Sequence, residues 1–547
     1  MKLLKSSLLG SAAAFAAVAA AQAADLPVKK AAPIEYVRVC SAYGAGFFYI
    51  PGTDTCLRLS GRARFEYGYQ APLSRGAGNG DYSGYRSLAR INLDARTQTA
   101  YGTLRAFVRL ETASRTGFPT MHSGTQNRIA NGFPALGVDG FGRVQQYFNT
   151  DKAFVQFAGF TAGRASSFFD FYAHDFEIQA GTLGSDVAST NLAAYTATLG
   201  NGFSATLSME DPSFRRTPTY SPAAVAAAAA VLGNSSLQTF AITQSPAPVF
   251  LGYNAAGLPV GLGFVDVIER NRLPDFVGVL RYDQPWGSAQ ISAAVHEINA
   301  GTVNSAAAQI VGANPGTLGR TASEYGWAVQ GGLKVNLPFI APGDTLYLQG
   351  AYAEGAQMYT GASAWAGSYI QQATSLQGAP FSQFFSDAVL NPLNNRLELT
   401  QSFTVVASLL HYWNPTLRSA LFGSYGEVAF APGARAAQAS YNGLAIGGIS
   451  NIGTFGSAYY NLNQILRDTY AFNVGGSLIW SPVKDLDIGV EGTYQNYGVQ
   501  SGRVIDLNRT PGATSAAGFN AAVAAGTLRT VTNADVFQVR ARVQRDF

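Results

Sequence analysis

The sequence predicts an all-β fold, a transmembrane antiparallel β-barrel of sixteen strands with long extracellular loops. Stretches of about ten residues alternate between apolar and polar side chains, which is the length and period of a tilted strand that crosses a bilayer. Short turns and long polar segments join these stretches alternately, as expected when the two kinds of connection lie on opposite sides of a membrane. Only 13% of the residues are charged, whereas 12% are aromatic and 60 are glycine, a balance that is unusual for a soluble protein.

The composition excludes several classes of protein. With 47% hydrophobic residues, 27 tyrosines and 34 phenylalanines, the chain is too apolar to be disordered. Beyond the N-terminus it has no apolar run of about 20 residues, which a membrane-spanning helix requires. Its net charge is +4, and no basic run is longer than the pair Lys29-Lys30. We therefore expect no nucleic-acid partner.

The first 23 residues are typical of a secretory signal peptide. Lys2 and Lys5 precede an apolar stretch at 8–21, which ends in Ala21-Gln22-Ala23. We expect residues 1–23 to be removed by cleavage after Ala23, which makes the mature chain an exported one. The alternative is a short membrane anchor, but the apolar stretch is shorter than the roughly 20 residues that a bilayer requires.

Residues 24–56 are expected to form an N-terminal periplasmic segment, followed by the barrel at 57–547. This segment holds both cysteines of the chain, Cys40 and Cys56. Because an exported protein meets an oxidising compartment, we predict a disulfide between them, worth about 3 kcal/mol in the chain-entropy description. Two free buried thiols are the alternative. No histidine lies nearby to complete a metal site.

The predicted strands are recognised by a period of two. In the first of them, Leu59, Phe65 and Tyr67 share one face, and Arg62 and Arg64 share the other. The sixteen stretches begin at 57, 90, 104 and 154 and then cover 160–165, 192–199, 203–209, 276–282, 289–297, 325–337, 345–353, 403–413, 417–430, 470–480, 486–497 and 536–547.

The outward faces of these stretches carry almost no charge, and this decides between two fold classes. A soluble β-sandwich or propeller would show the same alternation, but it would have no reason to exclude charge from a face that meets water. In lipid, an Arg or Lys at mid-bilayer costs about 2–4 kcal/mol. The last stretch follows the same rule, because Phe537, Val539 and Val543 alternate with Gln538 and Arg540. The pattern therefore favours a membrane barrel.

Four segments carry a resemblance to a known family. The longest reads VRVCSAYGAGFFYIPGTDTCL and covers residues 37–57, and shorter ones lie at 201–205, 274–278 and 543–547. The chain resembles the general porins of alphaproteobacterial outer membranes over 37–547, more weakly in the long loops. The connection at 210–275 is longer than the family pattern, which leaves its role open.

The resemblance implies a place, an assembly and a function. It implies the outer membrane of a Gram-negative bacterium, contact with outer-membrane lipid, and a homotrimer. The implied function is a water-filled pore for passive diffusion of small hydrophilic solutes and ions. It further implies that a loop at about 166–190 folds into the lumen as a constriction.

Barrel closure makes the last predicted strand a neighbour of the first, which gathers basic residues on one wall. The inward faces of these two strands and of the second and third carry the predicted pore-lining wall: Arg58, Arg62, Arg64, Arg90, Arg96, Arg105, Arg109, Arg540 and Arg542. The inward loop carries the opposing acids: Asp170, Asp175, Glu177 and Asp186. Facing charges of opposite sign create a transverse field that disfavours apolar solutes. The alternative is that these arginines are paired and only stabilise the wall.

No chemistry beyond transport is expected from the residues. A lipid hydrolase would need a serine and a histidine close together on the outer face, and only His411, with Ser408, suggests itself. We expect no enzyme activity, no cofactor and no metal. The open competitor is a substrate-specific channel for sugars or small anions, which the basic wall and an aromatic loop also suit. A surface adhesin is a more distant alternative.

Overall fold

The structure is a computed structural model that describes residues 38–71, 82–117, 144–172, 174–186, 189–217, 219–220, 247–253, 259–265, 269–303, 320–363, 372–373, 379–391, 396–435, 456–464 and 466–547. Its contacts divide the chain into two compact units, Met1–Arg58 and Leu59–Phe547. The signal peptide expected at 1–23 lies outside the described residues. Among the described residues, no helix is both long enough and apolar enough to cross a bilayer.

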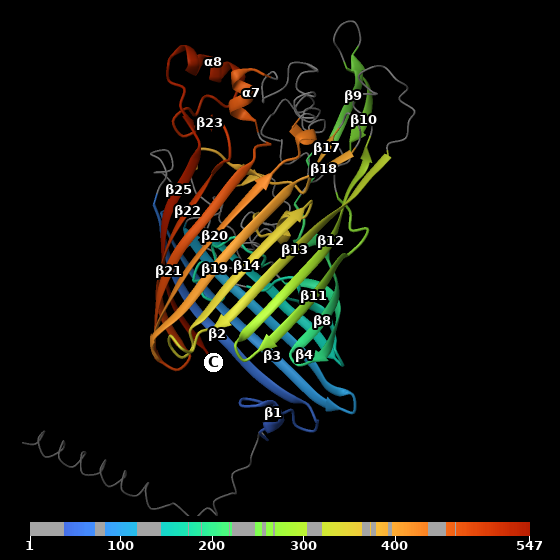
Figure 1. Cartoon of the computed structure of the whole chain (residues 1–547), viewed down its shortest axis with the longest axis vertical. Coiled ribbons are helices and arrows are strands. Elements are labelled where there is room, and N and C mark those ends of the chain that lie inside the picture. Colours follow the sequence, from blue (N-terminus) through green and yellow to red (C-terminus); the bar gives the residue numbers. More distant parts are fainter. Residues whose placement is uncertain are drawn as a thin grey trace, which may run out of the picture. The chain divides into compact units, whose positions relative to one another are not determined.

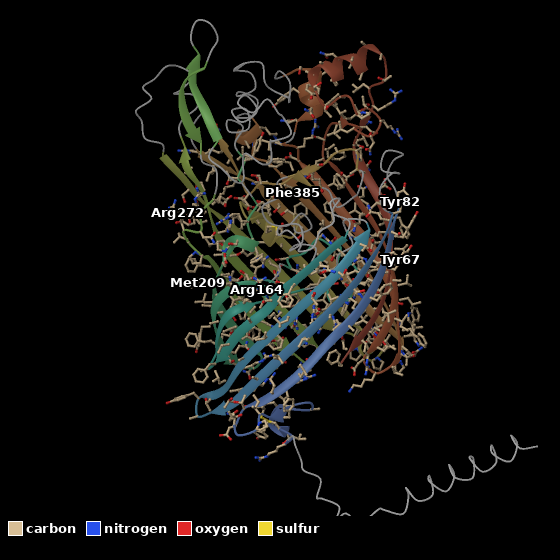
Figure 2. The ribbon with its side chains drawn as sticks, turned by 180° about the vertical axis from the view of Figure 1, so that it is seen from behind. Tyr67, Tyr82, Arg164, Met209, Arg272 and Phe385 are labelled. Atoms are coloured by element: carbon tan, nitrogen blue, oxygen red, sulfur yellow. A yellow bond between two sulfur atoms is a disulfide. The ribbon has the colours of Figure 1, made fainter. Side chains whose placement is uncertain are left out.

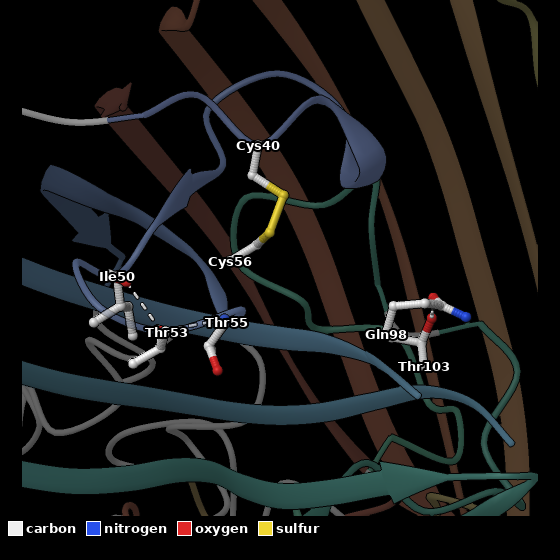
Figure 3. Close-up of a disulfide and its surroundings, with 7 residues drawn as sticks. All are labelled: Cys40, Ile50, Thr53, Thr55, Cys56, Gln98 and Thr103. Atoms are coloured by element: carbon white, nitrogen blue, oxygen red, sulfur yellow. Dashed lines mark hydrogen bonds between the residues drawn. A yellow bond between two sulfur atoms is a disulfide. The ribbon is translucent and has the colours of Figure 1, made fainter. Parts of the chain in front are cut away.

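The N-terminal unit is built around a disulfide. Cys40 and Cys56 are bonded, with their Cα atoms 5.9 Å apart (Figure 3). Both are buried together with Phe47. A 3-10 turn, η1 (Ser41–Tyr43), and a short strand, β1 (Phe48–Tyr49), lie between the two cysteines. The predicted disulfide is therefore confirmed.

The second unit is a closed barrel of sixteen antiparallel strands (Figure 1). Each strand pairs with its neighbours along the chain, and the last strand pairs with the first to close the sheet. The strands are β2 (Cys56–Gln70), β3 (Ser83–Thr99), β4 (Gly102–Gly117), β5 (Val144–Phe157), β6 (Phe160–Ala165), β7 (Thr190–Gly200), β8 (Phe203–Glu210), β11 (Asp275–Gln284), β12 (Gly287–Val303), β13 (Arg320–Asn336), β14 (Thr345–Glu354), β19 (Gln401–Asn414), β20 (Leu417–Ala429), β21 (Thr469–Val483), β22 (Leu486–Val499) and β25 (Asn533–Asp546).

The remaining elements belong to the long connections. They are the two-stranded pieces β9 (Ala247–Tyr253) with β10 (Pro259–Val265), β15 (Gln372–Ala373) with β16 (Gln383–Phe384), β17 (Ala388–Asn391) with β18 (Arg396–Leu399), and β23 (Val504–Ile505) with β24 (Thr530–Val531), and the helices η3 (Pro212–Phe214), η5 (Gln357–Tyr359), α7 (Ala458–Asn463) and α8 (Ala516–Ala524). Those that Figure 1 labels, namely β9, β10, β17, β18, β23, α7 and α8, lie at the end of the barrel opposite the short turns.

The side chains alternate between lipid and lumen as the period of two predicts. Tyr67 lies on the outer face, 37% exposed (Figure 2), whereas its neighbour Glu66 is fully buried inside. Leu207, in the middle of β8, is 75% exposed. These apolar outer faces meet acyl chains, so their exposure carries no hydrophobic penalty. The predicted fold class, strand number and face assignment are confirmed.

The short turns contain residues that sharp reversals require. In the turn between β7 and β8, Asn201 and Gly202 both have positive φ, 52° and 86°. A Cβ on Gly202 would lie 2.1 Å from the carbonyl oxygen of Asp283. Because Gly202 needs both the left-handed conformation and the close approach, only glycine fits there.

Two strands begin well before the residues at which they were predicted to start. β3 starts at Ser83 rather than at 90, and β5 starts at Val144 rather than at 154. The added residues belong to the loop end of the barrel, where polar side chains such as Gln146 and Thr150 face outward. The alternation of apolar and polar side chains fades where both faces of the sheet meet water. Each strand therefore extends beyond the residues that the alternation predicts.

Replacing Leu207 with Arg is expected to destabilise the folded barrel by about 2–4 kcal/mol, because a guanidinium would replace an apolar group in the middle of a lipid-facing strand. The measurement is the folding free energy in lipid vesicles by urea titration. Phe203→Arg, on the same face but next to the turn, is the matched control and should cost about 0–1 kcal/mol. Equal costs at both positions would contradict the assignment of this face to lipid.

Candidate functional site

A long connection between β6 and β7 folds into the barrel. This inward loop, residues 166–189, is anchored to the far wall by hydrogen bonds. Tyr172 donates its backbone N–H to Gln349 of β14 at 2.9 Å and its hydroxyl to Ser408 of β19 at 2.9 Å. The backbone of Leu183 donates to Ser424 of β20 at 2.8 Å. The predicted inward-folded loop is confirmed.

The aromatic residues of the inward loop serve mainly as anchors. Phe169 is fully buried in an apolar cluster with Tyr359 and the inner faces of β11 to β14. Tyr172 is equally buried and packs against Tyr347 of β14, with ring centroids 5.0 Å apart. Of the loop's aromatic rings, Phe176 borders the lumen cavity. Packing against the wall therefore holds the loop across the barrel.

A cavity of about 570 Å³ separates the inward loop from the wall formed by β2 to β5, β20 to β22 and β25. The basic side chains that line it are Arg62, Arg64, Arg86, Arg90, Arg109, Lys152, Arg418 and Arg542. The acidic side chains that line it are Glu111, Asp151, Asp175, Glu177, Asp186, Asp487 and Asp546. Both signs of charge therefore border the same water-accessible space.

The structure brings five of the nine predicted arginines to this cavity: Arg62, Arg64, Arg90, Arg109 and Arg542. The other four lie elsewhere. Arg96 and Arg105 both bind Asp94, at 2.8 and 2.9 Å. Arg540 is buried, and Arg58 is an exposed residue of the N-terminal unit.

The wall coincides with the seam at which the barrel closes. In the β2–β25 register, Arg62 lies opposite Asp546 and Glu66 opposite Arg542. Both are ion pairs, with nitrogen–oxygen distances of 2.6 Å. Arg64 lies opposite Gln544 and donates to its amide oxygen at 2.9 Å. Cross-strand partners of this kind stabilise sheet register, so the predicted basic residues also hold the barrel shut.

Further along the wall, each arginine also has a carboxylate partner. Arg90 binds Glu111 at 2.6 Å, and Arg109 binds Asp151 at 3.4 Å. The wall is therefore a lattice of guanidinium–carboxylate pairs, as the alternative hypothesis expected, and it still faces the cavity. Pairing with a carboxylate fixes the orientation of each guanidinium.

Glu66 is the centre of the buried part of this lattice. Its carboxylate binds Arg86 and Arg542, and Arg64 lies 3.9 Å away. Arg86 was missed by the sequence prediction because it belongs to the part of β3 before residue 90. Lys152 was missed because the β5 stretch was expected to begin at 154, and Arg418 because it stands on β20, outside the four strands from which the wall was predicted.

Three of the four predicted acids of the inward loop border the cavity, namely Asp175, Glu177 and Asp186. Glu177 is buried beside His174, with 3.1 Å between its Oε1 and the ring Nδ1. Burial disfavours the charged carboxylate, but His174 and hydrogen bonds from Thr182 outweigh this and keep the pKa of Glu177 below its usual value. Asp170 does not face the cavity and instead binds Arg215 at 2.6 Å.

A second part of the chain also folds into the barrel, and the sequence did not predict it. Phe384, Phe385 and Val389 form an apolar core with Ile298 of β12 and Val428 of β20 (Figure 2 labels Phe385). The connection between β14 and β19 was expected to be a polar loop outside the barrel. The apolar run 388–390, which two residues separate from Phe384 and Phe385, is the signal that was available, because an exposed loop would not retain it.

The connections that reach this apolar core also contain a buried carboxylate, that of Glu269, which lies outside the membrane-spanning strands. Glu269 binds Arg216 at 2.7 Å and accepts a hydrogen bond from the backbone of Thr219 at 3.0 Å. Burial raises the pKa of Glu269 to about 7. Asp387 acts in the same direction, whereas Arg216 and His296 oppose the shift. This carboxylate therefore takes up a proton near neutral pH.

The residues considered for other chemistry do not form a site. Ser408 faces the lumen and binds Tyr172, whereas His411 binds Asp344, at 2.7 Å. The two side chains follow opposite faces of β19, so no hydrolase pair forms. Over the part of the chain that is described, no group of three or more His, Cys, Asp or Glu side chains is arranged to hold a metal ion.

A closed antiparallel barrel with an apolar exterior and a charged lumen narrowed by an inward loop defines the porin class of outer-membrane proteins. A sequence profile of the porin subfamily matches residues 25–523, and the chain belongs to that family. Family membership assigns it to the outer membrane of a Gram-negative bacterium.

Two curated relatives are the porins Omp2b of Brucella abortus strain 2308 and of Brucella suis biovar 1 strain 1330, each 38% identical over 216 residues. The matched region is 38% of this chain and 54% of each relative, so the chain spans about half the length of the curated relatives it matches.

Solved structures are also similar. The outer membrane channel DcaP of Acinetobacter baumannii aligns with a TM-score of 0.46 and 13% identity, over 91% of this chain and 99% of that one. An anion-selective porin from Comamonas acidovorans aligns with a TM-score of 0.39 and 11% identity, over 90% of this chain and all of that one.

Replacing Glu66 with Gln is expected to destabilise the barrel by about 3–5 kcal/mol, because it leaves buried guanidinium groups without their carboxylate. The measurement is the urea midpoint of unfolding in detergent or vesicles. Asp546→Asn is the matched control. It breaks an ion pair across the same seam, but the side chain of Asp546 is 41% exposed, so the substitution should cost only about 0–1 kcal/mol. A mild effect at Glu66 would contradict its central role.

Glu269 is expected to make the stability of the loop end depend on pH. Its pKa is raised from 4.5 to about 7 on folding, so between these values the folded chain binds a proton that the unfolded chain releases. Stability should therefore fall as pH rises from about 5 to about 7. Glu269→Gln should flatten this part of the profile, measured as protection of the loops from protease at pH 5 and pH 8. An unchanged profile in the variant would exclude Glu269 as the group responsible.

Proposed function

We propose that the chain forms a water-filled pore for passive diffusion of small hydrophilic solutes and ions across the outer membrane. The observation that carries this proposal is the charged cavity between the inward loop and the arginine wall. A lumen lined by fixed charges on both sides stabilises water and ions, whereas an apolar solute that enters it loses hydration without compensation. Membership of the porin family supports the same conclusion.

The arrangement of charge suggests how solutes are oriented. Arg62, Arg64 and Arg542 stand on the wall, and Asp175 and Asp186 stand on the inward loop across the cavity. The field between them runs across the direction of permeation. A dipolar solute aligns with such a field as it passes, so the pore favours polar and zwitterionic molecules.

A substrate-specific channel for sugars or small anions is the second candidate, favoured by the excess of guanidinium groups on one wall. The two candidates differ in one measurable property. Conductance that rises linearly with solute concentration supports a general pore, whereas conductance that saturates and is competed by a sugar or an anion supports a specific channel.

We infer a homotrimer, no catalytic role and no cofactor, on the strength of membership of the porin family. Recording from single channels in a planar bilayer tests the assembly directly. Closure in three equal steps supports a trimer of independent pores, and single-step closure contradicts it.

Neutralising the cavity wall is expected to shift ion selectivity toward cations. The variant is Arg62→Gln with Arg109→Gln, both of which line the cavity and are partly exposed there. Each loses a positive charge while its carboxylate partner remains, so the local potential becomes more negative. The measurement is the reversal potential in a salt gradient.

Arg105→Gln is the matched control for this double variant. It lies on the same strand as Arg109 and faces the lumen, but it does not line the cavity. Its reversal potential should move less. Equal shifts in the control and in the double variant would contradict the assignment of this cavity as the constriction.

A further inference from the structure

The first part of the long connection after β8, as far as Tyr220, turns back into the barrel. Asp211 caps η3 by accepting the backbone N–H of Ser213 at 3.0 Å. The chain then reaches Tyr220, which exchanges backbone hydrogen bonds with the segment of β17, from Tyr220 N–H to Ala388 at 3.0 Å and from Leu390 N–H to Tyr220 at 2.7 Å. We call the described residues 211–217 and 219–220 the brace. They belong to the connection whose role the sequence left open.

Arg215 of the brace is completely buried, and its guanidinium binds the inward loop at two points. Nη2 donates to Asp170 Oδ1 at 2.6 Å, and Nη1 donates to Ser185 Oγ at 2.7 Å. Ser185 in turn donates to the same Asp170 oxygen. Asp170 and Ser185 stand near opposite ends of the loop, so one side chain ties its two ends together.

Aromatic rings and a third connection complete the pocket of Arg215. Its guanidinium carbon lies 4.4 Å from the ring centroid of Tyr359 and 5.6 Å from that of Phe169. Tyr359 belongs to η5, in the connection after β14. Burial opposes the charged form of Arg215, but Asp170 outweighs burial and raises its pKa above the usual value. The guanidinium is therefore a charged clamp at which three connections meet.

The clamp determines where the loop acids stand. Asp175 and Glu177 lie between the two clamped residues, and Asp186 directly follows Ser185. Hydrogen bonds to the wall, such as those from the backbone of Ile178 and Gln179 to Glu491 at 2.6 and 2.7 Å, hold the tip of the loop. Arg215 holds its base. The acidic side of the cavity is fixed only when both the tip and the base are fixed.

We propose that Arg215 is a positioning residue that sets the width and the transverse field of the pore, and that the brace exists to deliver it to the inward loop. This inference rests on the proposed function, because it assigns the long connection after β8 a part in permeation. The contacts of Arg215 with Asp170 and Ser185 lie outside the cavity. Arg215 therefore acts on the pore through these two residues and does not touch the solute.

The test compares Arg215→Met with Arg216→Met in planar bilayers, using the full-length chain. Both variants remove a buried guanidinium from the same segment, but Arg216 binds Glu269 and not the inward loop. For Arg215→Met we expect higher single-channel conductance, larger fluctuations of the open-channel current and a reversal potential nearer to zero. We expect Arg216→Met to match the wild type in conductance, current fluctuations and reversal potential. We expect Arg215→Lys to bring these three properties part of the way back to their wild-type values.

Asp170→Asn removes the other half of the clamp and serves as the second variant if Arg215→Met does not assemble. It should reproduce the larger fluctuations, and the double variant should add little, because the two residues act as one unit. Wild-type currents in both Arg215→Met and Asp170→Asn would overturn the inference, as would equal changes in Arg215→Met and Arg216→Met. A wild-type chain that does not conduct would overturn the proposed function instead.

Discussion

The structure depends on one constraint, which is that lipid offers no hydrogen-bond partner to the backbone. Every amide of the spanning wall must be satisfied within the sheet, and an open edge would leave a row of unpaired groups in the hydrocarbon. Pairing of β25 with β2 removes that edge. The side chains across this seam, Arg62 with Asp546 and Glu66 with Arg542, are charged pairs that face inward. The contact that closes the barrel is thus also part of the wall that borders the cavity.

Closure leaves an interior too wide for wall side chains to fill, and the connections take up the remaining space. The inward loop crosses the lumen and packs Phe169 and Tyr172 against the wall. The segment around Phe385 fills another part with an apolar core. The charged cavity is what these insertions leave against the arginine wall. Its size and lining therefore depend on the paths of loops as much as on the strands.

Charge inside the barrel is tolerated because it is organised. The wall arginines are held by carboxylates or by amide oxygens, and the deeper groups share partners, as Arg86, Arg542 and Arg64 share Glu66. The inward loop repeats the arrangement with Arg215, Asp170 and Ser185. Buried charges of this kind contribute little net stability, but removal of one partner is costly. Such networks hold a defined geometry, which a pore needs more than it needs added stability.

The sequence by itself determined the strand number, the lipid and lumen faces and the disulfide, and its resemblance to the porins indicated the inward loop. The strands and their faces follow from local patterns, because a period of two assigns each residue to a face and the lipid excludes charge from one of them. Only the tertiary structure decided which arginines share a cavity, why Arg86 joins them while Arg96 does not, and that residues near 215 and 385 return into the barrel. Those outcomes depend on register across the seam and on contacts between residues far apart in the chain, which local patterns do not encode.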